Sequence, residues 1–336
     1  MPTQQTRNLA ILASAQALLF TNNVTLIALN GLVGYQLATD KSLATLPVTT
    51  QVLGSALFAM PASHLMQRIG RRAGFLIGAL VGLVGGAIAT AGVVLQSLAL
   101  LCLGTFILGI YGAFGQFYRF AAADAAEPSF KAKAISLVVA GGLVGGIAGP
   151  ALSTWTRSLA PIEFAASYAS LMVFCLLTAL LLAGLAIPAP GGAAAGAPAR
   201  PLGAIARQPV FIVAVISSAF GYGVMNFLMT ATPLAMGICG HPYGAAAGVI
   251  SAHVVAMFAP SFFTGSLIQR FGVLRVMLAG VAIMALCLAV ALAGITIAHF
   301  WWALVLLGIG WNFMFVGGST LVTETYTPAE KAAAQG

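Results

Sequence analysis

The chain has 336 residues, of which 60% are apolar and 6% are charged. A soluble globular domain carries about a quarter charged residues, so this composition excludes one and predicts an integral membrane protein. Fourteen Lys and Arg against six Asp and Glu give a formal net charge of +8. These basic residues lie in short loops and not on a soluble domain, so we expect no nucleic-acid partner. Four cysteines lack metal-ligand spacing, and we expect neither a metal nor a cofactor.

Ten stretches are apolar enough and long enough to cross a bilayer, which takes about 20 residues. They are 8–31, 43–66, 74–95, 98–120, 134–157, 164–187, 209–236, 244–268, 273–297 and 300–322. Glycines recur at four-residue spacing from Gly74 to Gly86, a pattern that lets neighbouring membrane helices approach closely. The sequence therefore predicts an all-α polytopic membrane protein that interacts with the lipid bilayer.

Two features of the sequence occur twice. A basic hinge that reads Leu-x-Gln-Arg-x-Gly lies within 63–72 and again within 265–272, each time between two apolar runs. An acid-x3-Pro-x2-Lys pattern also occurs twice, about 200 residues apart. Its members are Asp124, Pro128 and Lys131, then Glu324, Pro328 and Lys331. Internal repeats in a polytopic protein are typical of secondary transporters.

A Pro-, Gly- and Ala-rich stretch separates the two copies. We predict an N-terminal bundle over 1–187, a cytosolic linker over 188–208 and a C-terminal bundle over 209–336. Six spans precede the linker and four follow it, so the repeat predicts an eleventh span just beyond Gly336. The chain would then lack about two spans; a natural ten-span protein is the alternative.

The distribution of Lys and Arg predicts the orientation of the chain. With a cytosolic N-terminus, only Lys41 and Arg157 lie outside. The residues that then lie inside are Arg7, Arg68, Arg71, Arg72, Arg119, Lys131, Lys133, Arg200, Arg207, Arg270, Arg275 and Lys331. Basic loops stay on the cytosolic side of a membrane. We therefore expect a multi-pass protein of a bacterial inner (plasma) membrane.

The first hinge resembles the best-known signature of the major facilitator superfamily, Gly-x-x-x-Asp-Arg-x-Gly-Arg-Arg. Here the signature reads Ser63-x-x-x-Gln67-Arg68-x-Gly70-Arg71-Arg72, with Gln67 where the family has Asp. The resemblance implies two pseudo-symmetric six-helix bundles and secondary transport by alternating access. A Gly-rich run that ends in Gly149-Pro150 is similar to the antiporter pattern, whereas Thr105 stands where many proton antiporters have Arg. Uptake and efflux by proton antiport both stay open.

In the family that this chain resembles, helices one, four, seven and ten line the central cavity. The corresponding spans carry amides and aromatic residues in their middles, and these are the candidate substrate-binding residues: Asn23, Asn30, Tyr111, Gln116, Tyr222, Asn226, Trp311 and Asn312. Such a set suits a small, ring-containing organic solute. The alternative is that the amides only bond helix to helix.

Charged residues at the ends of the spans are candidates for a cytosolic gate. They are Arg68, Arg71, Arg72, Asp124, Arg270 and Glu324, and Arg–carboxylate pairs among them would close one state of the transporter. An exposed pair contributes only about 0.2–1 kcal/mol, so it would tune an equilibrium and would not hold the fold. The alternative is that these charges only fix the topology.

His253 is the one ionisable side chain well inside a predicted span, since all six acidic residues fall at span ends or in loops. An imidazole could bind and release a coupling proton; a neutral, hydrogen-bonded histidine is the alternative. No catalytic triad, HExxH or phosphate loop occurs, so we expect no enzyme. The function predicted is that of a monomeric secondary transporter, with a non-transporting receptor or scaffold as the alternative.

Overall fold

The computed structural model describes residues 4–187, 200–327 and 329–335, and the regular elements in these ranges are helices. Nine of the described helices are long and apolar enough to cross a membrane, or ten if a bent pair at 248–271 is one span. The predicted all-α polytopic fold with about ten spans is confirmed. Residues 188–199 of the predicted linker lie outside the described residues, and the short helix α9 (Leu202–Ala206) follows them.

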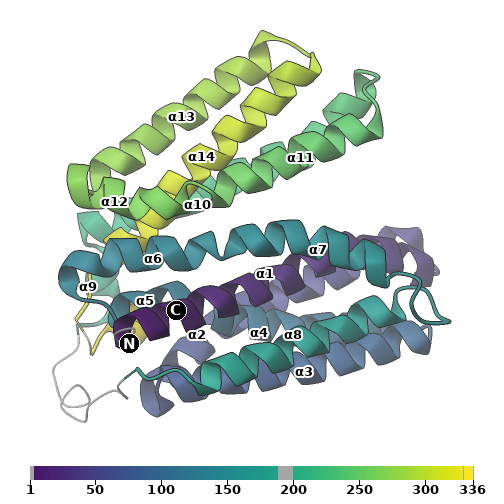
Figure 1. Ribbon diagram of the computed structural model, residues 1–336, viewed down its shortest axis with the longest axis horizontal. Helices are drawn as coiled ribbons and strands as arrows, with labels where there is room; N and C mark the ends of the chain where they lie inside the picture. The colour runs from purple at the N-terminus through teal and green to yellow at the C-terminus, as the bar shows by residue number, and fades with distance from the viewer. Residues whose placement is uncertain (1–3, 188–199, 328, 336) are drawn as a thin grey trace. The chain divides into compact units, whose positions relative to one another are not determined.

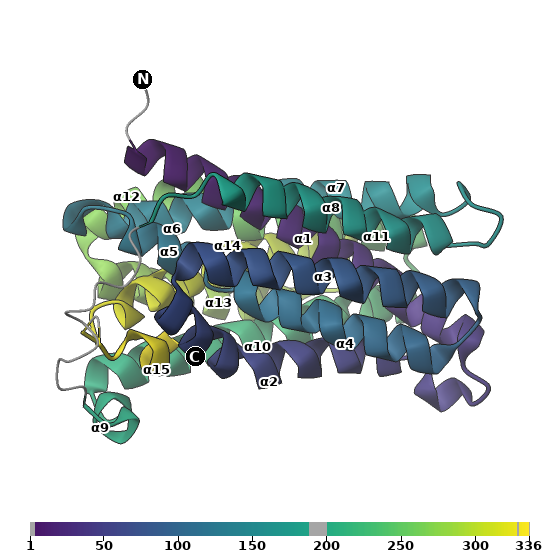
Figure 2. The ribbon, with the colours of Figure 1, turned by 90° about the horizontal axis from the view of Figure 1, so that it is seen from below.

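The chain divides into two compact units. Unit 1 comprises Met1–Ala121, Val144–Ala199 and Pro328–Gly336, and unit 2 comprises Ala122–Leu143 and Arg200–Thr327. The helices whose residues lie wholly or mainly in unit 1 are α1 (Gln4–Leu37), η1 (Lys41–Leu43), α2 (Leu46–Ile69), α3 (Arg71–Val94), α4 (Leu98–Gly115), α5 (Tyr118–Asp124), α7 (Gly142–Thr156), α8 (Ala165–Ala183) and α15 (Lys331–Gln335). Within unit 1, α3 and α4 lie side by side (Figure 2).

The glycine pattern of α3 produces the close packing that it predicts. A Cβ on Gly78 would lie 2.6 Å from Cβ of Phe114, and one on Gly82 would lie 2.8 Å from Cγ of Tyr111. Both distances are shorter than van der Waals contact, so only a hydrogen fits at these positions. In lipid, the hydrophobic effect does not drive helices to associate. Close packing of helices through small residues stabilises their association instead.

Unit 2 contains the broken span and a long helix pair. Its elements are η2 (Pro128–Phe130), α6 (Lys131–Ala140), α9, α10 (Pro209–Ile238), α11 (Tyr243–Phe258), α12 (Ser261–Phe271), α13 (Val273–Ala293) and α14 (Ile297–Val322). Helices α13 and α14 run side by side (Figure 1). The predicted span 244–268 is two helices and not one, because Pro260 lacks the amide N–H that a continuous helix needs; the halves are bent by 41°.

Helix α6 packs tightly on α12. A Cβ on Gly265 would lie 2.5 Å from Cα of Lys133 and 2.8 Å from the carbonyl oxygen of Ala132. The Ser136 hydroxyl accepts a hydrogen bond from N–H of Gly265 at 3.0 Å and donates to the carbonyl oxygen of Ser261. It thus bonds to two backbone groups in the first turn of α12.

The two copies of the hinge adopt the same backbone conformation. Gly70 ends α2 with φ 88° and ψ 160°, and Gly272 ends α12 with φ 86° and ψ 150°. A positive φ is readily available only to glycine. The sequence repeat is therefore also a repeat of local structure, since each hinge turns directly into the next helix at Arg71 or Val273.

Gly265→Ala should lower the melting temperature of the purified protein, because its Cβ meets the backbone of α6, which cannot move aside cheaply. We expect a loss of about 1–3 kcal/mol of stability, the usual range for overpacking. Thermal unfolding in detergent, followed by tryptophan fluorescence, measures this loss.

The matched control is Gly248→Ala in α11. A Cβ on Gly248 meets nothing within 4 Å, so this variant should be neutral or stabilised by up to about 1 kcal/mol, the difference in helix propensity. Equal melting temperatures for the two variants would contradict the tight packing of α6 on α12.

Candidate functional site

A buried chain of polar side chains joins three helices of unit 1. The Tyr168 hydroxyl on α8 donates to Oδ1 of Asn30 on α1 at 2.7 Å. Nδ2 of Asn30 in turn donates to Oε1 of Gln51 on α2 at 3.0 Å. Tyr168 and Asn30 are completely buried, whereas Gln51 is partly exposed. Asn30 is therefore inaccessible inside unit 1, and Gln51 lies at the partly exposed end of this series of hydrogen bonds.

The other three candidates in unit 1 are not brought together. Tyr111 is buried, and its hydroxyl donates to Oγ1 of Thr178 at 3.3 Å. Gln116 is exposed and accepts a hydrogen bond from Arg119 at 3.0 Å. Asn23 is partly buried and has no hydrogen-bond partner within the part of the chain that the structure describes. Tyr111 thus joins α4 to α8, which leaves Asn23 and Gln116 as the accessible members.

Two candidates in unit 2 belong to one aromatic cluster, which consists of Tyr222, Phe258, Trp311 and Phe315. Trp311 stacks on Phe315, with ring centroids 4.6 Å apart and an interplanar angle of 14°. Phe258 meets Trp311 edge-on at 5.8 Å, and Tyr222 lies 6.3 Å from it. Trp311 is 2% exposed and Tyr222 49%. The cluster is therefore closed around Trp311 and open at Tyr222.

The indole N–H of Trp311 is buried without a hydrogen-bond partner among the described residues. A buried donor normally finds an acceptor, and one left without a partner costs about 1–3 kcal/mol. This N–H is therefore a buried donor without a described partner, next to an aromatic surface that is partly open.

Asn312, the neighbour of Trp311 on α14, makes a full set of bonds inside unit 2. Its Nδ2 donates to the carbonyl oxygen of Met257 at 2.7 Å and to the hydroxyl of Ser261, and Oδ1 accepts from Oγ1 of Thr264 at 2.7 Å. Met257 and Ser261 flank the break between α11 and α12, where backbone groups lack their usual helical partners. Asn312 is 0% exposed and ties the broken span to α14.

The face of α10 that points away from Tyr222 lines an apolar cavity of about 650 Å³. Its lining residues are Ile216, Ala219, Phe220, Gly223, Val224, Phe227, Leu228 and Leu288. None of these side chains can donate or accept a hydrogen bond, so the cavity cannot orient a polar solute. Tyr222 and Asn226 do not line it, and Asn226 is exposed.

The candidate gating residues lie at the ends of helices, and neighbouring amides make the specific hydrogen bonds. In unit 1, Gln67 donates to the carbonyl oxygen of Ala329 at 3.0 Å, and Arg71 donates to Oε1 of Gln335. In unit 2, Gln269 donates to the carbonyl oxygen of Ser129 at 2.5 Å. The two hinge glutamines thus make equivalent contacts. Ala329 lies two positions before Lys331, where α15 begins, and Ser129 lies two positions before Lys131, where α6 begins.

The charges of the predicted gate are mostly exposed. Arg68, Arg72, Asp124, Arg270 and Glu324 are exposed, and Arg71 is partly buried. Arg270 lies over the ring of Phe271 at 5.2 Å, and no ion pair joins it to Glu324 in the described part of unit 2. A role for these residues in gating stays a prediction.

His253 on α11 is completely buried. Its Nδ1 lies 2.8 Å from the carbonyl oxygen of Leu304 on α14, so Nδ1 carries a proton. Nε2 has no partner among the described residues. This geometry suits both a neutral histidine that joins two helices and a proton carrier, so proton coupling stays a prediction.

Residues 12–336 match the family model of the Major Facilitator Superfamily. The chain belongs to this superfamily. It is 46% identical over 337 residues to the riboflavin transporter RfnT of Brucella anthropi, a match that covers 99% of this chain and 85% of the relative. The chain is therefore a multi-pass membrane transporter and not an enzyme.

Solved structures of the superfamily share the fold. The fucose:proton symporter FucP of E. coli matches with a TM-score of 0.74 at 19% identity, over 97% of this chain and 86% of FucP. The human organic anion transporter MFSD10 matches with a TM-score of 0.80 at 12% identity, over 100% of this chain and 89% of that chain. At these identities, the likeness concerns the fold alone.

Asn312→Ala should destabilise the protein, because it leaves the carbonyl oxygen of Met257 and the hydroxyl of Ser261 without the hydrogen bonds that Asn312 makes to them. We expect a loss of about 1–3 kcal/mol, the cost of a buried polar group left unbonded. Thermal unfolding measures it, with Asn226→Ala as the control because Asn226 is exposed. A melting temperature equal to that of the control would contradict the structural role of Asn312.

Proposed function

We propose that this transporter moves riboflavin across a bacterial inner membrane by alternating access. The observation that carries the proposal is the 46% identity to the riboflavin transporter RfnT, which extends over 99% of this chain. The expectation of a ring-containing organic solute agrees with this proposal.

The aromatic cluster of unit 2 has the chemistry that the flavin ring system needs. Riboflavin carries a flat three-ring isoalloxazine with carbonyl oxygens and ring nitrogens that accept hydrogen bonds. Tyr222 offers an exposed aromatic face for such a ring, and aromatic pairs contribute about 0.5–1.5 kcal/mol beyond the area that they bury. The unpartnered indole N–H of Trp311 would suit one of the ring acceptors.

The remaining polar candidates divide into two groups in this proposal. Asn226, on the same helix as Tyr222, is exposed, and its amide could bond to the ribityl hydroxyls of riboflavin; Asn23 and Gln116 are the accessible candidates of unit 1. Asn30, Tyr111 and Asn312 are buried and bonded to other helices of their own units, so they would hold those helices in place.

The orientation of the chain is part of the same proposal. The excess of Lys and Arg at the span ends and connections near Arg7, Arg68 and Arg207 favours a cytosolic N-terminus. A cysteine introduced at Lys41 should then react with a membrane-impermeant maleimide in intact cells, and one introduced at Arg72 should react only after permeabilisation. Labelling of Arg72→Cys in intact cells would contradict this orientation.

Proteoliposomes that contain the purified protein should accumulate riboflavin faster than protein-free liposomes, and excess unlabelled riboflavin should compete. Loading riboflavin inside or outside tests efflux and uptake separately, and a pH gradient tests proton coupling. Saturable binding without movement in either direction would support the receptor alternative. The absence of both binding and movement would contradict riboflavin as the solute.

Tyr222→Ala should weaken riboflavin binding about tenfold, equivalent to about 1.4 kcal/mol, because the variant loses the exposed aromatic face. Quenching of flavin fluorescence on titration with protein measures the affinity. The matched control is Phe220→Ala, which removes a ring of similar size, 69% exposed, from the apolar face of the same helix. Equal losses in both variants would mean that Tyr222 acts only through packing.

A further inference from the structure

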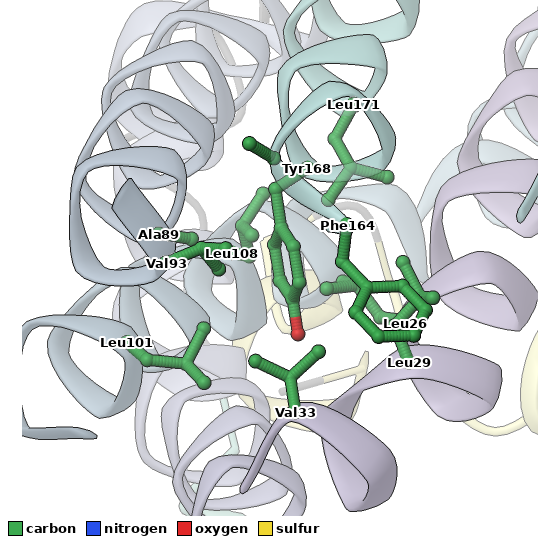
Figure 3. Packing of buried hydrophobic residues seen from close by; sticks show 11 residues of the cluster. Leu26, Leu29, Val33, Ala89, Val93, Leu101, Leu108, Phe164, Tyr168 and Leu171 are labelled. Carbon is green, nitrogen blue, oxygen red and sulfur yellow. The ribbon is translucent and has the colours of Figure 1, made fainter. Parts of the chain in front are cut away.

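Tyr168 lies among apolar side chains, and its hydroxyl has one hydrogen-bond partner among the described residues. It belongs to a cluster of buried residues of α1, α3, α4 and α8 that includes Leu26, Leu29, Val33 and Leu108. Figure 3 shows its ring among these side chains, with the hydroxyl oxygen near Val33. Since buried hydroxyls are normally hydrogen-bonded, the Tyr168 proton has to go to Oδ1 of Asn30, at 2.7 Å.

This bond fixes the orientation of the Asn30 amide. With Oδ1 turned toward Tyr168, the Nδ2 group faces α2 and donates to Oε1 of Gln51 at 3.0 Å. In the flipped amide, Nδ2 would donate to the Tyr168 oxygen, and the hydroxyl proton would be left among Leu and Val side chains. That arrangement would leave a buried donor unbonded at a cost of about 1–3 kcal/mol.

The orientation of the Asn30 amide determines that of the Gln51 amide. Its Oε1 is taken up by Asn30, so the group that it presents outward is Nε2, which carries two N–H donors and no acceptor. Nε2 has no hydrogen-bond partner among the described residues, and Gln51 is partly exposed. An amide donor within a membrane-spanning helix is costly unless it faces water or a bound molecule.

We propose that Gln51 is a specificity-determining residue of this transporter, whose Nε2 donates to a hydrogen-bond acceptor of the transported solute. Tyr168 and Asn30 act as positioning residues that keep Gln51 in the donor orientation. The inference rests on the proposed function, because the isoalloxazine of riboflavin presents carbonyl oxygens and ring nitrogens side by side. A solute that presents only donors at this position is rejected.

The test compares riboflavin affinities, measured by flavin fluorescence, of Gln51→Leu and Gln51→Glu with that of the unchanged protein. Gln51→Leu should raise the Kd at least tenfold. Gln51→Glu keeps the acceptor that Asn30 needs but turns a carboxylate oxygen toward the solute, so the Kd should rise at least a hundredfold. Lowering the pH until this carboxyl is protonated should restore part of the affinity, because the acid then donates again.

Tyr168→Phe distinguishes positioning from packing. Without the hydroxyl, Asn30 is free to flip and Gln51 loses its fixed orientation, so the Kd should rise about three- to tenfold. In a Gln51→Leu background the same change should have no further effect, because there is no amide left to orient. Gln36→Leu, an exposed glutamine at the end of α1, is the control and should bind like the unchanged protein.

The possible outcomes distinguish a failure of this inference from a failure of the proposed function. Tight riboflavin binding by both Gln51 variants would overturn the role of Gln51 and leave riboflavin transport standing. Additive losses in the double variant would overturn the positioning role of Tyr168. No riboflavin binding by the unchanged protein, with normal thermal unfolding, would overturn the proposed function and this inference with it.

Discussion

Every polar group inside a membrane-spanning segment needs a partner within the protein or at a wet surface, because lipid offers none. This constraint accounts for the most closely bonded places in both units. Where α11 and α12 break apart, Asn312 bonds to the carbonyl oxygen of Met257, and Ser136 bridges Ser261 and Gly265. Side chains from two other helices thus bond to the backbone on either side of the break.

Close packing through glycine makes these bonds geometrically feasible. The side chain of Ser136 is short. Its hydroxyl reaches the α12 backbone only because Gly265 lets α6 approach to contact distance. In unit 1 the same device joins α1 to α7, where a Cβ on Gly145 would lie 2.6 Å from the backbone nitrogen of Thr21. At the contact of α6 with α12, a small residue and buried hydrogen bonds thus stabilise the same packing.

The spans and hinges could be predicted from the sequence because their signals are local. A run of apolar residues shows where a span lies, and Leu-x-Gln-Arg-x-Gly shows where it ends, since Gly70 and Gly272 supply the positive φ that the turn needs. The break at Pro260 is also a local signal, but the prediction of one span over 244–268 passed over it. Membrane helices tolerate proline often enough that it does not by itself predict a break.

The assignment of the polar residues to roles could not be predicted in the same way. Asn312 and Asn226 are both amides in the middle of apolar spans, yet one is completely bonded and the other is exposed. Sequence spacing gives the face of a helix but not what packs against that face. Gln51 was missed for this reason, since its importance comes from Asn30, 21 residues away, and from Tyr168 on a third helix.

Trp311 and Asn312 show how one helix can serve the fold and the function at once. Successive residues in a helix point about 100° apart, so Asn312 bonds to the backbone of the broken span while Trp311 packs on Phe258 and reaches Tyr222 on α10. Asn312 has its hydrogen bonds completed inside unit 2, and the Trp311 N–H is left unbonded. In a membrane protein, a satisfied amide therefore marks structure, and a buried donor without a partner beside an open aromatic face marks the place to expect a solute.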